Sequence, residues 1–143
     1  MKRNFYQAGL GIVVALLLLA GQALAQDSHI FAYAIPFAFH AGNVKLPAGQ
    51  YIVKIPSSAR GLVYLESRNG TNHAMLLTLP FAQGKSQAPA ELVFNQYGKT
   101  YFLSKVTDSL SVKGQEVMKS KVEKEYMRQA QVPKTVDVAQ SNR

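Results

Sequence analysis

Short runs of β-branched, aromatic and other apolar residues, separated by turn-forming residues, occupy most of the chain between positions 30 and 108. Such runs, bounded by Gly, Pro, Asn and Ser, are typical of β-strands. The sequence predicts six strands, at residues 30–39, 51–55, 62–67, 74–79, 92–97 and 100–106. Pro36 interrupts the first run, and Pro80 is predicted to end the fourth, because proline cannot donate to the hydrogen-bond ladder.

Two turn sequences predict which of these strands pair. Asn69-Gly70 separates the third run from the fourth, and both residues tolerate the positive φ that a two-residue type I′ turn requires. Gly98-Lys99 separates the fifth run from the sixth and fits a type II′ turn, with Gly at the first central position. We therefore expect two antiparallel hairpins.

The pattern changes to a helical one near the C-terminus. Ser120 and Glu123 have the spacing of a capping box, in which each side chain bonds to a backbone N–H at the start of a helix. Val122, Tyr126 and Ala130 follow at a spacing of four, which places them on one helix face. A helix of about three turns is marginal by itself. We therefore expect it to dock on the sheet through Val122 and Tyr126.

These elements predict a mainly β fold: an antiparallel meander of about six strands with one C-terminal helix. The sequence leaves open whether the meander forms a sandwich or a small barrel. Residues 26–131 are predicted to form this single β-rich domain. Residues 132–143 are polar and are expected to form a disordered tail.

Residues 1–25 have the three-part layout of a secretory signal peptide. Lys2 and Arg3 precede an uncharged apolar run, and small residues at Ala23 and Ala25 fit a signal peptidase site. We expect cleavage after Ala25 and a periplasmic or secreted mature protein. A retained membrane anchor is the alternative, since about 20 apolar residues can span a bilayer.

The composition restricts the partners of an exported chain. The chain has no cysteine, so packing alone must hold the domain together in an oxidising compartment. The net charge of the full chain is +8, and +6 remains without Lys2 and Arg3. We expect this charge chiefly to keep the protein soluble, and its counter-surfaces, if it has any, to be anionic lipid headgroups, lipopolysaccharide or acidic polysaccharide. Nucleic acid is not expected as a partner. The basic segment at residues 113–128 is a weak candidate for contact with an anionic membrane surface, because its acidic residues nearly balance its basic ones.

Several short segments occur together in the expected mature chain, at residues 36–39, 41–43, 46–51, 92–94, 97–98, 101–104 and 119–123. In this combination the chain resembles an uncharacterised family of small exported β-rich bacterial proteins with no assigned activity. The resemblance implies a β-rich exported domain and transfers no catalytic residue. Residues 46–51 (Leu-Pro-Ala-Gly-Gln-Tyr) also resemble a turn of bacterial surface β-sandwich modules.

Three histidines are the candidates for a catalytic base or a metal ligand: His29, His40 and His73. Nucleophilic catalysis needs a nucleophile, a base and an orienting acid, but the chain contains neither a cysteine nor a Gly-x-Ser-x-Gly motif. We therefore expect His40 and His73 to be solvated residues at strand ends. His29 would bind Cu(II) or Ni(II) with the N-terminal amine only if processing left Asp27 as the first residue. No metal ligand and no cofactor is predicted.

Three carboxylates outside the helix could supply an acid–base pair for glycoside hydrolysis: Glu66, Glu91 and Asp108. They lie at the ends of predicted strands, where solvated carboxylates are common. We therefore predict no catalytic residue and no enzymatic activity, and a small envelope hydrolase is the least favoured hypothesis.

Eight aromatic residues could line a cavity for a hydrophobic ligand. They are Phe31, Tyr33, Phe37, Phe39, Phe94, Tyr97, Tyr101 and Phe102. Because aromatic side chains pair across strands, we expect them to form the core instead. The sequence thus predicts a non-enzymatic envelope protein that binds a partner, through a sheet edge or the C-terminal helix. A periplasmic carrier of a lipid or another hydrophobic small molecule is the alternative.

Overall fold

The computed structural model describes residues 28–59, 61–83, 89–109, 111, 113–129 and 132–141. The predicted leader, residues 1–25, lies outside the described residues. Within the described part, no helix is long and apolar enough to cross a membrane. The predicted mainly β fold with one helix near the C-terminus is confirmed.

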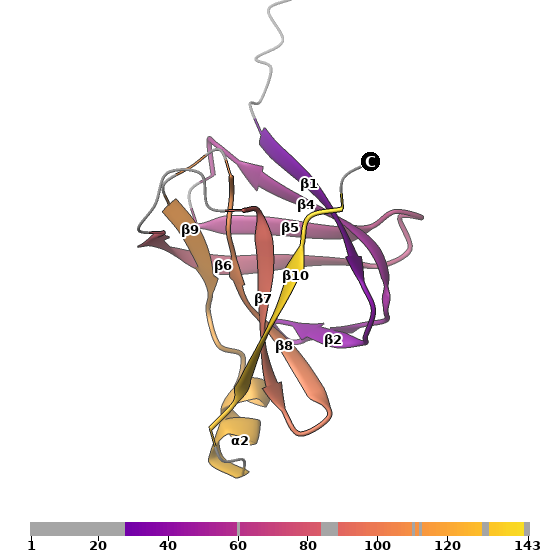
Figure 1. The fold of residues 1–143 in the computed structure, drawn as a ribbon, viewed down its shortest axis with the longest axis vertical. Helices are drawn as coiled ribbons and strands as arrows, with labels where there is room; N and C mark the ends of the chain where they lie inside the picture. The colour runs from indigo at the N-terminus through magenta and orange to yellow at the C-terminus, as the bar shows by residue number, and fades with distance from the viewer. Residues whose placement is uncertain are drawn as a thin grey trace, which may run out of the picture.

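Ten strands and one helix make up the described fold (Figure 1). They are β1 (Ser28–Ile35), β2 (Phe39–Ala41), β3 (Val44–Leu46), β4 (Gly49–Pro56), β5 (Leu62–Ser67), β6 (His73–Ala82), β7 (Glu91–Tyr97), β8 (Thr100–Val106), β9 (Lys113–Val117), α2 (Lys121–Gln129) and β10 (Lys134–Ala139). The predicted hairpins β5–β6 and β7–β8 are confirmed, since both pairs are antiparallel.

Neighbouring strands follow the order β1-β4-β5-β6-β9-β8, and β8 also pairs with β7, which pairs with β10. The hairpin β2–β3 joins this path because β2 pairs in parallel with β8 at Phe39–Tyr101 and His40–Phe102. The sheet is therefore mixed. Pro36 explains the departure, because it ends β1 and lets the chain leave the edge of β4 and reach β8.

The two ends of the strand path meet at a single place. Tyr33 of β1 forms an isolated antiparallel bridge with Gln140, and Ser141 N donates to Ala32 O at 2.8 Å. In Figure 1, β5 and β6 run across the direction of β7 and β10. Buried side chains of β5, β6 and β7 belong to the same core cluster. The sheet thus wraps around one core and stays open except at this bridge.

Alternate residues of the strands form the core, as the period of a strand requires. Phe39 is fully buried, with its ring edge-to-face against Tyr51 and Phe94 at centroid distances of 5.3 and 5.4 Å. Six of the eight aromatic residues expected in the core are buried. The other two, Phe37 and Tyr101, are half-buried and stack on each other at 4.0 Å.

The prediction that Pro80 ends its strand is wrong. β6 continues to Ala82, and Pro80 lies opposite Gln115 of β9. Thr78 N donates toward β5, to Gly61 O at 2.8 Å. Because backbone donors alternate along a strand, the nitrogen of Pro80 faces the same side, beyond the first residue of β5. No ladder bond of β5 is lost there, so the strand tolerates proline.

The turn between β5 and β6 also differs from the prediction. A type I′ turn centred on Asn69-Gly70 would start at Arg68, but Gly70 N donates to Ser67 O at 2.8 Å, so the turn starts at Ser67. The Asn69 side chain accepts from Thr71 N at 3.2 Å, which is an Asx turn. Gly70 has a φ of +71°, in the left-handed region that favours glycine. Asn69 therefore supports a four-residue loop.

The expected disordered tail at residues 132–143 is wrong for Lys134–Ala139. This segment forms β10, which pairs with β7 over six residue pairs. Val136 and Val138 alternate with polar residues and lie half-buried against the core. The domain therefore extends past residue 131, because these valines cover the core and β10 occupies the edge of β7.

The predicted cap at Ser120 is confirmed, but its glutamate has a different role. Glu123 N donates to Ser120 Oγ at 3.1 Å. The Glu123 carboxylate does not turn back to the cap: it points into the sheet, where it accepts from Asn95 Nδ2 at 2.9 Å and from Tyr97 OH at 3.4 Å. A buried carboxylate, only 3% exposed, thus fastens α2 to β7.

The docking face of α2 matches the prediction in part. Tyr126 packs on Phe102 of β8 with a centroid distance of 5.4 Å, and Val122 is half-buried. Ala130, the third residue of the predicted face, lies outside the described residues. Glu123, rather than an apolar side chain, is the most deeply buried residue of the helix.

Candidate functional site

β6 carries large apolar side chains on both of its faces. Ala74 and Leu76 point into the core and are buried. Met75, Leu77 and Leu79 point outward and are 64%, 61% and 61% exposed. Strands that are apolar on both faces are typical of sheets that are covered on both sides. The outer side of β6 therefore has the apolar composition of a buried surface, but no other described segment of the chain packs on it.

Neighbouring strands extend this surface. Tyr64 lies opposite Met75 in the β5–β6 register, and Leu62 lies opposite Leu77. Met118, just after β9, donates its N–H to Leu77 O and is itself exposed. We call the set the outer apolar face. It consists of Leu62, Tyr64, Met75, Leu77, Leu79 and Met118.

An ion pair lies at the rim of the outer apolar face. Lys54 Nζ contacts Glu66 Oε2 at 3.0 Å, and both side chains are partly exposed. With Tyr64, Met75 and His73 they line a shallow hollow of about 260 Å³. Glu66, one of the three candidate carboxylates, is thus paired with a lysine, while His73 is exposed at the start of β6 as expected.

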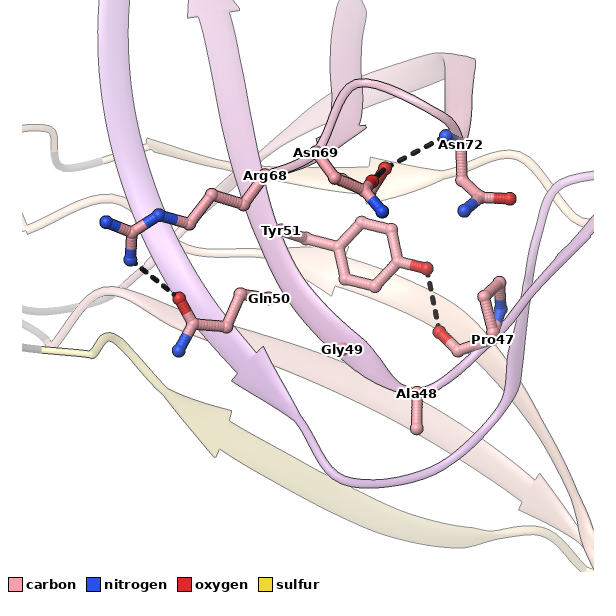
Figure 2. Close-up of a pocket in the computed structure, with 9 residues that line it drawn as sticks. Pro47, Ala48, Gly49, Gln50, Tyr51, Arg68, Asn69 and Asn72 are labelled. Carbon is pink, nitrogen blue, oxygen red and sulfur yellow. Dashed lines mark hydrogen bonds between the residues drawn. The ribbon is translucent and has the colours of Figure 1, made fainter.

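A second, polar hollow of about 270 Å³ lies between the turn at Pro47 and the β5–β6 loop (Figure 2). The Tyr51 hydroxyl donates to Pro47 O at 2.7 Å, which fixes the phenol ring between the two turns. Arg68 Nη1 donates to Gln50 Oε1 at 2.9 Å on the side toward β1. The segment that resembles a surface-module turn therefore forms one wall of this hollow.

The structure brings two of the candidate residues together. His29 Nδ1 donates to Asp108 Oδ2, although the residues are 79 positions apart. Asp108 is only 3% exposed, so the expectation of a solvated carboxylate at this strand end is wrong. The pair borders a hollow of about 150 Å³. Burial, then the charges of Asp108 and Glu91, raise the pKa of Tyr33, whose hydroxyl is neutral in the core.

The other candidates are dispersed over the fold. His40 stacks on Phe102 at 4.8 Å and is half-buried, so its predicted place as a solvated strand-end residue is wrong. Glu91 begins β7, and its backbone N–H bonds to Thr107 Oγ1 at 2.8 Å. Among the residues that the structure describes, no group of three or more His, Cys, Asp or Glu side chains could hold a metal ion.

The environment of His40 predicts a pH dependence of stability. Burial, and to a smaller extent Lys45, lowers the pKa of His40 from its ordinary value of about 6.5. As the pH falls below about 6.5, the unfolded chain takes up a proton that the folded protein resists. The free energy of unfolding should therefore decrease below this pH and level off once the lowered pKa is passed.

Urea denaturation of the wild type and of His40→Phe between about pH 7.5 and 5 measures this effect. The substitution retains an aromatic ring on Phe102 and removes the titrating group. We expect a shallower loss of stability for the variant, since the two proteins differ in no other titrating group. Identical pH slopes would contradict the assignment.

Comparisons with family models, with curated proteins and with solved structures find no match to this chain. The resemblance to an exported β-rich family therefore stays a prediction. The function is argued below from the surfaces of the described residues.

Proposed function

We propose that this chain is an exported, non-enzymatic envelope protein that binds another protein through the outer apolar face. One observation carries the proposal: Met75, Leu77 and Leu79 are adjacent on one strand and each is more than half exposed. Scattered exposed apolar residues are ordinary on protein surfaces. A contiguous patch next to a polar rim is instead the usual mark of an interaction site.

The composition of the outer apolar face fits a protein partner. Interface cores are enriched in aromatic residues and methionine, and charged groups concentrate at their rims. Here Tyr64, Met75 and Met118 belong to the face, and the Lys54–Glu66 pair lies at its border. Complete burial of one Leu or Met side chain contributes about 1.5–3 kcal/mol. A few such residues therefore suffice to anchor a partner.

The alternative of a hydrophobic-ligand carrier has less support. The aromatic residues that could have lined its cavity pack against one another in the core. Of those eight aromatic residues, Tyr33 alone lines one of the four hollows described above and below, the one next to β1. Export itself rests on the predicted leader.

The test is capture of a partner from an envelope extract of the producing host. We expect Leu77→Thr combined with Leu79→Thr to weaken the captured complex at least about tenfold, since two anchors lose apolar contact area. Threonine keeps the β-propensity of the strand. Exposed substitutions change stability by about 0.5 kcal/mol or less, so the thermal midpoint should stay close to that of the wild type.

Val44→Thr is the matched control, because Val44 is an exposed apolar residue of β3 outside the outer apolar face. It should retain the captured protein in full. Equal capture by the double variant and the wild type would refute the proposed binding surface. A second copy of the chain as the captured protein would reassign the face to dimerisation, which sedimentation at several concentrations measures directly.

A further inference from the structure

Two hollows meet at Arg68. The polar hollow of Figure 2 and a neighbouring hollow of about 320 Å³ share Gln50, Tyr51 and Arg68 as lining residues. The second hollow extends toward β1, and Ala32 of β1 and Ile52 of β4 belong to its lining. The hydrogen-bonded pair Arg68–Gln50 therefore lines two adjacent depressions of similar size. We call them together the double hollow, and none of its residues belongs to the outer apolar face.

Arg68 brings an unneutralised positive charge to this place. Its side chain is exposed, and its hydrogen bond goes to the neutral amide oxygen of Gln50. The ion pairs among the described residues are His29–Asp108 and Lys54–Glu66, so Arg68 takes part in neither. A guanidinium has five N–H donors in a planar fork that fits a carboxylate bidentately. The charge and the donors of Arg68 thus remain available to an anionic group.

Side-chain amides supply the complementary groups beside the charge. Asn69 Oδ1 is occupied, because Ser67 Oγ, Thr71 N and Thr71 Oγ1 donate to it at 2.7, 3.2 and 2.8 Å. This arrangement turns its amide nitrogen toward the Tyr51 ring, with Asn72 next to it (Figure 2). Asn72 Nδ2 donates to Thr71 Oγ1 at 2.9 Å, which leaves its second N–H and its Oδ1 for the hydroxyl groups of a ligand, while Asn69 offers its amide nitrogen as a donor.

The walls of the double hollow are held in place before any ligand arrives. Tyr51 is buried, and its hydroxyl is fixed by Pro47 O. Ser67 Oγ in turn receives the N–H of Asn72 at 2.9 Å, which ties the loop to the end of β5. A site that is already ordered loses little conformational entropy on binding.

We propose that the double hollow binds an anionic sugar, whose carboxylate pairs with Arg68 while its hydroxyl groups contact Asn69 and Asn72. The ligand needs both a carboxylate and hydroxyl groups. A simple anion would make no hydrogen bond to the amides of Asn69 and Asn72, and a neutral sugar would leave the charge of Arg68 unpaired. Two adjacent depressions that share three lining residues offer room for more than one sugar ring, so an acidic oligosaccharide fits better than a single residue.

Titration of the exported protein with trigalacturonate, followed by amide chemical shifts in NMR, tests the proposal. We expect saturable shifts at Asn69 and Asn72, and at least tenfold weaker binding of neutral galactotriose. Arg68→Gln should weaken trigalacturonate binding at least about tenfold, as the loss of a charge-assisted hydrogen bond implies. The affinity of Arg68→Lys for trigalacturonate should lie between that of the wild type and that of Arg68→Gln, because lysine keeps the charge but lacks the planar pair of donors.

Arg128→Gln is the matched control, since Arg128 is an exposed arginine in the last turn of α2 and its loss changes the net charge equally. Equal weakening by Arg68→Gln and Arg128→Gln would mean general charge attraction and would overturn the proposal. Equal affinity for the neutral trisaccharide would overturn it too. Binding of inorganic phosphate in preference to trigalacturonate would replace it with a phosphate site. Failure of these titrations leaves partner capture by the outer apolar face unaffected.

Discussion

Phe39→Ala is expected to lower the free energy of unfolding by about 3–5 kcal/mol, the range for removing a fully buried aromatic ring. Phe39 is 0% exposed and contacts two aromatic rings, those of Tyr51 and Phe94. It also lies on the three-residue strand β2, which joins β8 through only two residue pairs. The loss therefore removes core packing and the anchor of a short strand together.

Urea denaturation of the wild type and the variant measures this change as a shift in midpoint at unchanged slope. Val44→Ala is the control, because Val44 lies on the paired strand β3 with its side chain exposed. It should cost about 0.5 kcal/mol or less. Since single domains are stable by only about 5–15 kcal/mol, Phe39→Ala should bring this domain close to unfolding. A loss similar to that of the control would exclude Phe39 as a centre of the core.

Glu123→Ala should lower the free energy of unfolding by about 2–3 kcal/mol, because it leaves one buried and one half-buried donor without their acceptor. Those donors are Asn95 Nδ2 and Tyr97 OH, both on β7. Burial, and then Glu123, raises the pKa of Tyr97, so its hydroxyl remains a neutral donor near pH 7. The helix would keep its cap at Ser120 but lose the contact that holds it to the sheet.

Hydrogen exchange across α2, together with urea denaturation, measures the effect. Glu125→Ala is the control, since Glu125 is exposed on the same helix. We expect fast exchange in α2 for Glu123→Ala only. Unchanged protection of α2 in this variant would show that Tyr126 alone suffices for docking.

The sequence predicted correctly those strands whose own residues and whose adjoining turns favour the same local structure. The bounds of β5 and β8 match the predicted runs at residues 62–67 and 100–106. Most residues of both strands are apolar or β-branched, and both strands adjoin a Gly-containing turn, so propensity and turn chemistry favour the same structure. The cap at Ser120 was predictable for the same reason.

β9 could not be predicted, because its sequence, Lys-Gly-Gln-Glu-Val, carries no strand pattern. Its neighbours impose the strand: β6 and β8 bond to its two edges. Gly114 lies under the ring of Phe81, where an added Cβ would come within 2.4 Å of the ring. Glycine is unfavourable in strands, but the packing of the Phe81 ring on β9 requires it at position 114, and this contact exists only in the folded chain.

The outer apolar face had a signal in the sequence that local reasoning could not interpret. Residues 74–79 are apolar at five of six positions, instead of alternating, and the sequence identified a strand there without showing which face is exposed. The His29–Asp108 pair and the double hollow had no such signal. Each joins segments that only the sheet topology brings together.

The bridge between Tyr33 and Gln140 has a consequence for biosynthesis. It connects β1 to a residue that directly follows β10, the last strand of the described part of the chain, so the two ends of the strand path cannot meet before β10 has formed. Because synthesis proceeds from the N-terminus, β10 is the last of the described strands to become available to the sheet. Deleting residues 134–143 should remove this bridge and expose the edge of β7, while β1 stays paired with β4, and it should increase cleavage of the domain by proteases.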